Sequence, residues 1–502
     1  CTRTLNQHCG APTSPFELRC ALDMILRKEL QPLRCAWHFL LHDSLGRLIL
    51  GSSMLVIGFF STQFLLSFLP GNVSAALWRA VAYGAFGVSL FLYASLRNFG
   101  KVDSYIGTGD DLRRVYDSMP TAQRSPDPPF WAFGGNVQFM PWMLYNLFSA
   151  TFQPLDFEKQ HLSVKGLQDK TRPESKTNPR SMEDDVILNH FPFCMSHDLP
   201  MEAPVIVVEP GLTCTAQDVP GSSFLRRAVD RGFRIVVIER RGHGAPLKSP
   251  RWNLFGDSDD TEQIYEALQE RYPKTQGFFW IGFSSGSKLP IEGQGKFDAR
   301  KENGKTAPSF VAMACICPGY NLETCFMGFK FPYRQMCLSS TKSKFLLQNE
   351  ALLRSFNPEA YEKAMNSADL QELLLHVAPF AGYSTGKEYF EHENPVLFAP
   401  QVRTPCLIIN AMDDPLTVPT NAFGKMPGRE NGPTFAEMIQ QSTCGLLLMA
   451  PSGSHCPFLD GQMPLTKVSK SLGGLTLNCW ADSCVLEFFE GFLAEKSKSV
   501  DK

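Results

Sequence analysis

An alternation of short apolar runs with longer helical patterns, starting at residue 204, most constrains how this chain folds. Each run is almost continuously apolar, as expected for strands covered on both faces. Segments with helical spacing lie between them, such as 222–231 and 259–271. Strand and helix repeated in this way predict an α/β fold with a doubly wound, mostly parallel sheet. The expected strands are 205–209, 233–239, 278–283, 310–317, 406–411 and 446–450.

Residues 320–400 interrupt this alternation with helical material and no clear strand, which we interpret as a cap inserted over the carboxyl edge of the sheet. Upstream, HLSVKG and DVILNHF are expected to be leading antiparallel strands. The glycine- and lysine-rich stretch 293–307 and the stretch 424–432 are expected to be loops in solvent.

Two apolar segments precede the alternation. Residues 48–69 run for about 22 residues without a charge, which at about 1.5 Å per residue crosses the roughly 30 Å hydrocarbon layer of a bilayer. A Pro-Gly-Asn break follows, and residues 80–96 form a second, shorter uncharged run. Together they predict a transmembrane helical hairpin. The predicted organisation is an N-terminal segment (1–46), the hairpin (47–97), a linker (98–127) and a main domain (128–495).

Arginine and lysine residues flank the hairpin on both outer sides, and its short connection holds only Arg79. The positive-inside rule then predicts that both flanks and the main domain face the cytosol. We expect the membrane to be an endomembrane. The second run also fits a buried or interfacial helix, which leaves one span and puts the main domain on the other side. A third apolar patch, 129–148, is interrupted by Pro141 and fits either packing at a domain entrance or lying in the membrane interface.

The overall charge and the cysteines exclude some kinds of partner. A formal net charge of −2 gives no basic footprint, so no nucleic-acid partner is expected. The 15 cysteines are scattered, and only Cys315 and Cys317 lie close together in the sequence. Because metal-ligand spacing is absent, we expect no metal, no cofactor and mostly single thiols.

The stretch WIGFSSGS fits a strand that runs into a sharp turn presenting one serine, Ser284. Such a turn needs small flanking residues, because neighbouring backbone approaches it closely, and Gly282 and Gly286 supply them. The G-x-S-x-G pattern is common by chance, but its place directly after the strand 278–283 favours a nucleophile at the carboxyl end of the sheet.

A serine nucleophile needs a base, and the base needs a carboxylate to orient it. In this arrangement the acid precedes the histidine and each follows a strand. The strand 406–411 leads into Asp413-Asp414-Pro415, and the strand 446–450 leads into His455. We prefer Asp414 as the acid, with Asp413 as the alternative or as a cap of its turn.

The oxyanion that forms on an attacked carbonyl requires two preorganised donors. The backbone N–H of Ser285 is one expected donor. The other is that of Leu212, which Gly211 is expected to let point into the site.

The motifs PGLT, GFRIVVIERRGHG, RYPKTQGFFWIGFSSG, GYSTGKEYF, TPCLIINAMDDPLTV and GSHCPFLDG together resemble the membrane-anchored abhydrolase-domain (YheT-like, embryogenesis-associated) branch of the α/β hydrolases. FWAFGGNVQFMPWML also resembles that branch, so the resemblance covers roughly residues 128–495. It implies an α/β-hydrolase fold with a helical cap, usually behind a membrane anchor, and esterase or lipase activity on acylglycerols, phospholipids or short acyl esters. The nucleophile, acid and base motifs fall on Ser284, Asp414 and His455.

The chain departs from the family pattern near the serine. Ser285 and Ser287 stand where the family has a large apolar residue and a glycine, and Cys214 replaces a glycine of the oxyanion loop. Pro290 and Gly293 are expected to shorten or kink the helix after the turn.

The leading hypothesis is a membrane-anchored serine hydrolase that cleaves lipid esters. Two alternatives remain at this point, a catalytically silent scaffold that binds a lipid or a protein, and an acyltransferase. The second draws on an H-x-x-x-x-D pattern from His455 to Asp460.

Overall fold

The protein is described from a computed structural model. Residues 98–502 form one compact unit, to which the following description refers. The described residues are 100–129, 132, 134–165, 182–191, 199–217, 222–329, 331–417, 422–423, 425–426, 429–461, 467–471 and 473–500, together with Gly84 and Gly87. Apart from those two glycines, the predicted segments 1–46 and 47–97 lie outside this set, so the hairpin stays a prediction. Among the helices of the described residues, none combines the length and apolarity needed to cross a membrane.

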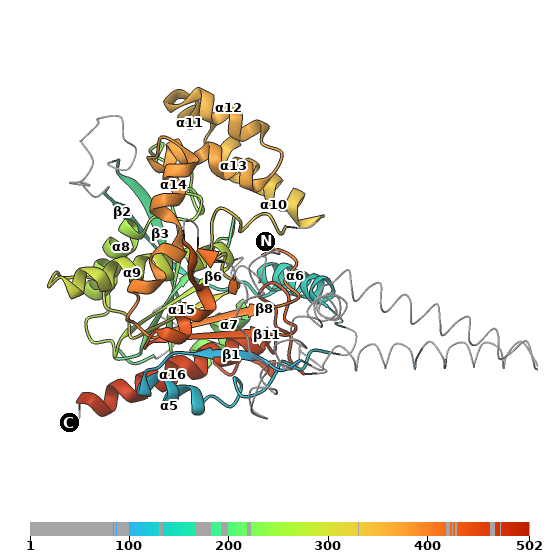
Figure 1. Cartoon of the computed structure of the whole chain (residues 1–502), viewed down its shortest axis with the longest axis vertical. Helices are drawn as coiled ribbons and strands as arrows, with labels where there is room; N and C mark the ends of the chain where they lie inside the picture. The colour runs from blue at the N-terminus through green and yellow to red at the C-terminus, as the bar shows by residue number, and fades with distance from the viewer. Residues whose placement is uncertain are drawn as a thin grey trace, which may run out of the picture. The chain divides into compact units, whose positions relative to one another are not determined.

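A nine-stranded sheet runs through the unit in the order β1-β11-β8-β7-β6-β4-β5-β3-β2 (Figure 1). The six inner strands pair in parallel, while β1 at one edge and β3 and β2 at the other pair antiparallel. The predicted mostly parallel sheet and the two leading antiparallel strands are therefore confirmed. The strands are β1 (Asp103–Ile106), β2 (Glu158–Val164), β3 (Asp184–Phe191), β4 (Val205–Glu209), β5 (Arg234–Glu239), β6 (Phe278–Phe283), β7 (Ala312–Ile316), β8 (Cys406–Ala411) and β11 (Gly445–Ala450).

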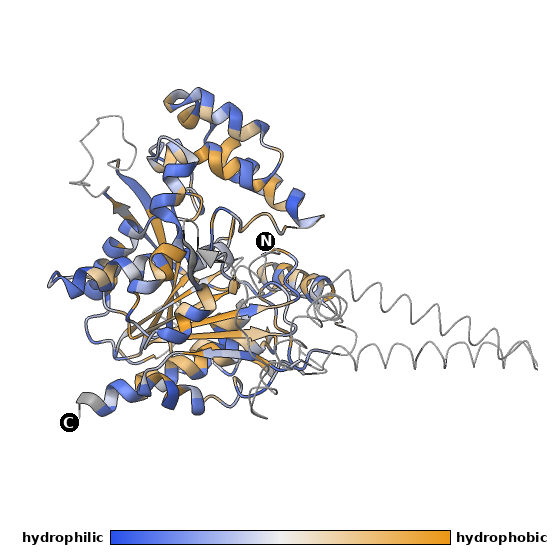
Figure 2. Cartoon of the chain, viewed as in Figure 1, coloured by the Kyte–Doolittle hydropathy of each residue, from blue (hydrophilic) through white to orange (hydrophobic). Residues whose placement is uncertain are grey.

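Alternate residues of each inner strand enter two hydrophobic cores, one on each face of the sheet. In β6, Phe279 and Ile281 lie in one core, whereas Phe278 and Trp280 lie in the other. Each fully buried side chain of this kind stabilises the fold by about 1.5–3 kcal/mol. The inner strands therefore stand out as apolar ribbons in Figure 2, and their apolar runs could be recognised without any alternation of polar residues.

Helices cover both faces of the sheet. One core includes side chains of α7 (Ser222–Asp230), α5 (Asp110–Asp117) and α16 (Trp480–Val500). The core of the opposite face includes side chains of α8 (Ser258–Arg271), α9 (Lys288–Glu302) and α15 (Phe435–Gln441).

Two segments differ from their sequence-based predictions. Most of the predicted loop 293–307 belongs to α9, where an added Cβ at Gly293 would lie 2.9 Å from the Trp280 ring, so the glycine lets the helix pack closely. Pro290 neither shortens nor kinks α9, because it lies in the first helical turn, whose N–H groups need no intrahelical partner.

The predicted linker and the predicted loop 424–432 also contain secondary structure. Residues 98–127 include β1 and α5, because a four-residue strand shows too little pattern to be recognised before it pairs with β11. The stretch 424–432 contributes to a small hairpin of β9 (Lys425–Met426) and β10 (Arg429–Thr434).

The segment between β7 and β8 is largely helical and shares a third hydrophobic core with residues 247–255, which lie between β5 and α8. Its helices lie together at one end of the sheet (Figure 1). They are α10 (Tyr333–Thr341), η3 (Lys342–Leu347), α11 (Glu350–Phe356), α12 (Pro358–Asn366), α13 (Leu370–Val377), η4 (Ala378–Ala381), α14 (Gly386–Glu393), η5 (Pro395–Leu397) and η6 (Ala399–Gln401).

Candidate active site

The turn after β6 holds Ser284 in a strained backbone conformation, with φ of +52°. β6 ends at Phe283, and a 3₁₀ turn, η2 (Ser284–Ser287), leads without a break into α9. A non-glycine residue in this region costs about 1–3 kcal/mol and persists only where the surrounding structure enforces it. The strain therefore identifies Ser284 as a residue held out from the sheet.

The two glycines beside Ser284 are required by close backbone contacts. A Cβ added to Gly282 would lie 2.5 Å from the Ser287 Cα, and one added to Gly286 would lie 2.4 Å from the Glu209 carbonyl oxygen. Real Cβ atoms do not approach backbone this closely. The glycines of the G-x-S-x-G pattern thus serve packing of the turn against β4 and α9, as expected for this kind of turn.

The structure brings Ser284, His455 and Asp414 together from three different loops. The Ser284 Oγ lies 2.7 Å from the His455 Nε2, and the His455 Nδ1 lies 2.8 Å from the Asp414 Oδ2. His455 and Asp414 are buried, whereas Ser284 is partly exposed. The hydrogen bonds run in the order that a nucleophile, a base and an orienting acid require.

The neighbouring aspartates have separate hydrogen-bond partners. Asp414 also accepts hydrogen bonds from the backbone N–H groups of Leu416 and Thr417, at 2.8 and 3.0 Å. Asp413 instead accepts the N–H groups of Gly453 and Ser454, at 2.9 and 2.8 Å. Asp414 therefore touches the histidine, while Asp413 ties the acid loop to the histidine loop.

Burial and charge shift the pKa values of the acid and the histidine in opposite directions. Burial lowers the pKa of His455, but the adjacent Asp414 carboxylate, together with Cys317, raises it further than that, to about 10. Burial raises the pKa of Asp414, but the His455 charge and the hydrogen bonds to the carboxylate lower it overall. The pair thus stabilises an imidazolium, the species that forms when a histidine takes a proton from serine.

The expected oxyanion loop lies directly beside Ser284. A Cβ added to Gly211 would be 3.5 Å from the Ser284 Cβ, which is ordinary contact. Gly211 does not have a positive φ, whereas Thr213 does, at +60°. Ser285 lies in the first turn of η2, where N–H groups lack an intrahelical partner, so its N–H is free to bind an anion.

Arg240 holds the oxyanion loop in place through hydrogen bonds to its backbone. Nothing in the sequence indicated this role. Its guanidinium donates to the carbonyl oxygens of Pro210 and Gly211, at 3.0 and 3.3 Å, and lies 3.8 Å from the Glu209 carboxyl. Burial raises the pKa of Glu209 to about 8, although Arg240 opposes the shift. The cap adds a second link, because the Lys344 Nζ donates to the Thr213 carbonyl at 2.8 Å.

Backbone strain is concentrated around the same site. Among the described residues, all non-glycine residues with a positive φ follow β4, β6, β7 or β11. Such strain clusters at functional sites. These residues are Thr213, Ser284, Cys317, Ser454, Cys456 and Phe458.

Helix α6 (Gly135–Phe152) supports the histidine loop. The Ser454 Oγ donates to the Gly135 carbonyl at 2.5 Å, and the Gln138 Nε2 donates to the Ser452 Oγ at 2.7 Å. The Phe139 ring lies 6.4 Å from the His455 ring. The patch predicted at 129–148 therefore contributes to the site, and only its aromatic residues hinted at this.

The comparisons with known proteins agree with this geometry. The alpha/beta hydrolase family matches residues 205–468, just over half of the chain. The chain belongs to the alpha/beta hydrolase family.

Relatives of this hydrolase include lipid-processing enzymes at modest identity. An abhydrolase domain-containing protein of Dictyostelium discoideum is 24% identical over 418 residues, which covers 80% of this chain and 90% of that protein. Mouse monoacylglycerol lipase ABHD2 is 23% identical over 329 residues, covering 61% of this chain and 69% of the lipase. Human phospholipase ABHD3 is 25% identical over 270 residues, covering 52% of this chain and 60% of the phospholipase.

The departures from the family pattern leave the turn of this hydrolase intact. The Ser287 hydroxyl is buried and donates to the Gly282 carbonyl at 2.7 Å, so it supports the turn. Asp460 pairs with Arg124, at 2.8 Å between Oδ1 and Nη1, and not with His455. The H-x-x-x-x-D pattern therefore does not form a separate acid–base pair.

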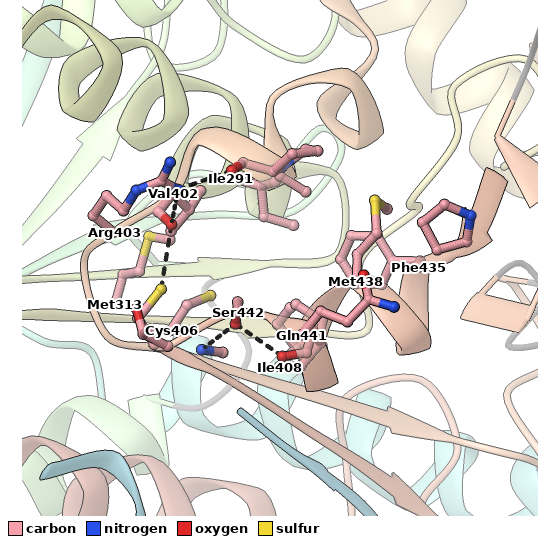
Figure 3. Close-up of a pocket in the computed structure, with 17 residues that line it drawn as sticks. Ile291, Met313, Val402, Arg403, Cys406, Ile408, Phe435, Met438, Gln441 and Ser442 are labelled. Carbon is pink, nitrogen blue, oxygen red and sulfur yellow. Dashed lines mark hydrogen bonds between the residues drawn. The ribbon is translucent and has the colours of Figure 1, made fainter. Parts of the chain in front are cut away.

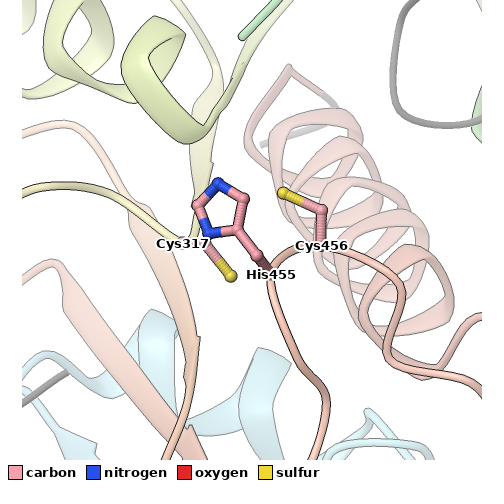
Figure 4. Close-up of side chains that lie close together, drawn as sticks. All are labelled: Cys317, His455 and Cys456. Atoms are coloured by element: carbon pink, nitrogen blue, oxygen red, sulfur yellow. The ribbon is translucent and has the colours of Figure 1, made fainter. Parts of the chain in front are cut away.

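Two thiols lie close to the base of the hydrolase (Figure 4). The Cys317 and Cys456 sulfurs and one ring nitrogen of His455 all lie within 4.8 Å of one another, which is compatible with metal binding. However, Asp414 and Ser284 already occupy both His455 nitrogens. Burial raises the pKa of both thiols, so they are protonated at neutral pH.

A cavity of about 450 Å³ lies away from the triad (Figure 3). Its lining includes Met313, Cys406 and Gly445 at or near the amino ends of β7, β8 and β11, the opposite ends from the triad loops. Burial raises the pKa of the Cys444 thiol in its wall to about 12, which leaves that thiol unreactive. The cavity therefore takes no part in the chemistry assigned to Ser284.

Proposed function

We propose that this protein is a serine hydrolase that cleaves carboxylic esters of lipids, acylglycerols or phospholipids, from a membrane anchor near its N-terminus. The hydrogen-bonded chain from Ser284 through His455 to Asp414, at the end of a strained turn, carries this proposal. The lipase and phospholipase relatives support a lipid ester as substrate, and the uncharged segments 48–69 and 80–96 support the anchor and a cytosol-facing site.

In the proposed first step, Ser284 Oγ attacks the ester carbonyl carbon while His455 Nε2 takes the hydroxyl proton. The carbonyl π electrons move onto its oxygen, and the N–H groups of Leu212 and Ser285 stabilise the resulting anion. Asp414 holds the imidazole in orientation and stabilises its positive charge. When the tetrahedral intermediate collapses, the bond to the alcohol breaks and His455 gives its proton to the leaving oxygen.

The second step reverses these roles and releases the acyl group. Water attacks the acyl-enzyme carbonyl while His455 takes one of its protons, and a second oxyanion forms in the same place. Its collapse breaks the bond to Ser284 Oγ, which regains a proton from His455, and the carboxylic acid leaves. An acceptor alcohol in place of water would make the reaction an acyl transfer, so product analysis with added alcohols separates the two.

The decisive experiment is labelling of the native full-length chain with a fluorophosphonate. The expected result is labelling of the wild type and none of Ser284→Ala, with Ser497→Ala, which changes an exposed serine of α16, as a control that keeps the label. Equal labelling of wild type and Ser284→Ala overturns the proposal. A folded wild type that takes no label and turns over no acyl ester favours the silent scaffold instead.

A further inference from the structure

One face of α6 exposes a continuous stripe of large apolar side chains. The whole helix, from Gly135 to Phe152, contains no charged residue. Side chains three or four positions apart share a face of a helix, and the exposed residues follow that spacing. They are Met140, Leu144, Leu147, Phe148 and Phe152, with exposed fractions of 55%, 62%, 66%, 40% and 71%. The opposite face, with Phe139 and Tyr145, is buried against the hydrolase. Contiguous exposed apolar surface of this kind marks an interaction site.

A second group of exposed apolar residues lies in α10 and in the segment that leads into it. Met327, Phe331 and Met336 are 71%, 81% and 48% exposed. The segment packs against α6, because the rings of Phe139 and Tyr333 meet edge to face at 5.1 Å between centroids. We call the two groups together the apolar rim.

The apolar rim borders the triad. The Gly135 carbonyl, in the first turn of α6, accepts a hydrogen bond from the hydroxyl of Ser454, the residue before His455. Phe139 lies between the rim and the His455 ring. A partner that covers the rim therefore lies close to the histidine loop of the triad.

The path of the chain indicates what covers the rim. β1 runs antiparallel to β11 with Asp103 opposite Met449, so the chain joins the sheet at the carboxyl end of β11, which leads to His455. Gly100 packs against Pro451 at that same end. The predicted apolar segment 80–96 ends only a few residues earlier in the sequence. The described chain thus enters the hydrolase at the end of the sheet that carries the triad.

We propose that the apolar rim is a docking surface for a zwitterionic phospholipid bilayer, which opens the site directly onto its lipid substrate. This inference rests on the proposed membrane anchor and lipid-ester function. The uncharged helix suits the interior side of the headgroup region, and the absence of Lys and Arg from α6 removes any need for anionic lipid. The rim then selects bilayer-borne esters over esters dissolved in water.

The first test measures docking without catalysis. The full-length chain, carrying an environment-sensitive fluorescent amino acid at Leu147, is reconstituted into phosphatidylcholine vesicles with and without brominated acyl chains. Met201 is the matched control, because it is apolar, 60% exposed and lies before β4 at the opposite end of the sheet. We expect bromine to quench the probe at 147 at least twofold and to leave the probe at 201 unchanged. Blue-shifted emission at 147 without quenching shows that protein covers the rim and overturns the proposal, as does emission typical of water.

The second test measures substrate selection. The triple variant Leu144→Gln, Leu147→Gln, Phe152→Gln should lower the ratio of vesicle-borne to water-soluble ester hydrolysis about tenfold, whereas Met201→Gln leaves the ratio unchanged. An unchanged ratio in the triple variant contradicts docking. If the wild type hydrolyses neither ester, the proposed function fails, and the bromine test still decides whether the rim meets lipid.

Discussion

The carboxylate of Asp413 accepts the backbone N–H of Ser454 at 2.8 Å, so two residues 41 positions apart join the acid loop to the histidine loop. Its neighbour Asp414 bonds the histidine itself. One aspartate of the pair therefore holds the loops together, and the other acts on the imidazole.

This division predicts different effects for the two aspartates. Asp414→Asn should lower kcat about 10⁴-fold with the fold intact, because the histidine loses the anion that orients it and stabilises its charge. Asp413→Ala should instead lower the free energy of unfolding by about 1–3 kcal/mol, because buried N–H groups lose their acceptor. Ester hydrolysis and urea unfolding of both variants check this. Equal loss of stability in the two variants, or full activity of Asp414→Asn, contradicts the assignment.

The pH dependence should follow from the raised pKa of His455, about 10. Only the neutral imidazole accepts the serine proton, so kcat/KM is expected to rise with pH until the histidine is deprotonated. Asp414→Asn removes the carboxylate that raises this pKa, and so should move the rise in activity to lower pH while reducing its plateau. Rates of ester hydrolysis from pH 5 to 10.5 measure the shift. A profile that does not move in the variant shows that another group controls it.

The turn around Ser284 should not tolerate a side chain at Gly286. Its Cβ would lie 2.4 Å from the carbonyl oxygens of both Glu209 and Pro210, so Gly286→Ala should displace backbone and either prevent folding or abolish fluorophosphonate labelling. Gly211→Ala is the control for stability, because its Cβ meets only ordinary contacts at 3.5 Å and beyond. Thermal unfolding of both variants makes the comparison, and a Gly286→Ala protein with native stability and labelling contradicts it.

Arg240 should position the oxyanion loop without touching the substrate. Arg240→Met leaves the Pro210 and Gly211 carbonyls without the arginine donor. We expect kcat to fall about tenfold. This is less than the roughly 10²–10³-fold fall that follows complete loss of one oxyanion donor, because the loop is displaced and not removed. KM should change less than kcat, since the loop acts mainly on the transition state. Arg240→Lys should recover part of the loss.

A matched control separates this effect from general loss of an arginine. Arg300 lies in α9, is partly exposed and pairs with Glu262 of α8, so it does not contact the triad loops through this ion pair. Arg300→Met should leave kcat unchanged. A kcat for Arg240→Met equal to that of the wild type rules out the positioning role.

The sequence by itself was sufficient for the parallel strands and for the order of serine, acid and histidine. Central strands are buried on both faces, so runs such as 278–283 are apolar throughout and recognisable without any partner. The G-x-S-x-G pattern was informative because it directly follows such a run, and Gly282 relieves contacts within the turn itself, whereas Gly286 relieves contacts with Glu209 and Pro210.

Only the tertiary structure decided between Asp413 and Asp414, since adjacent residues point in different directions and their partners lie about 40 residues away. The tertiary structure also showed that α9 is a helix. Its glycines pack against Trp280 and Phe398, and without knowledge of those contacts a glycine-rich stretch suggests a loop. Arg240 escaped notice for the same reason, and the patch 129–148 was recognised without its contact to the histidine loop. Both roles depend on hydrogen bonds to loops distant in the sequence, and such contacts leave no periodic pattern in the chain.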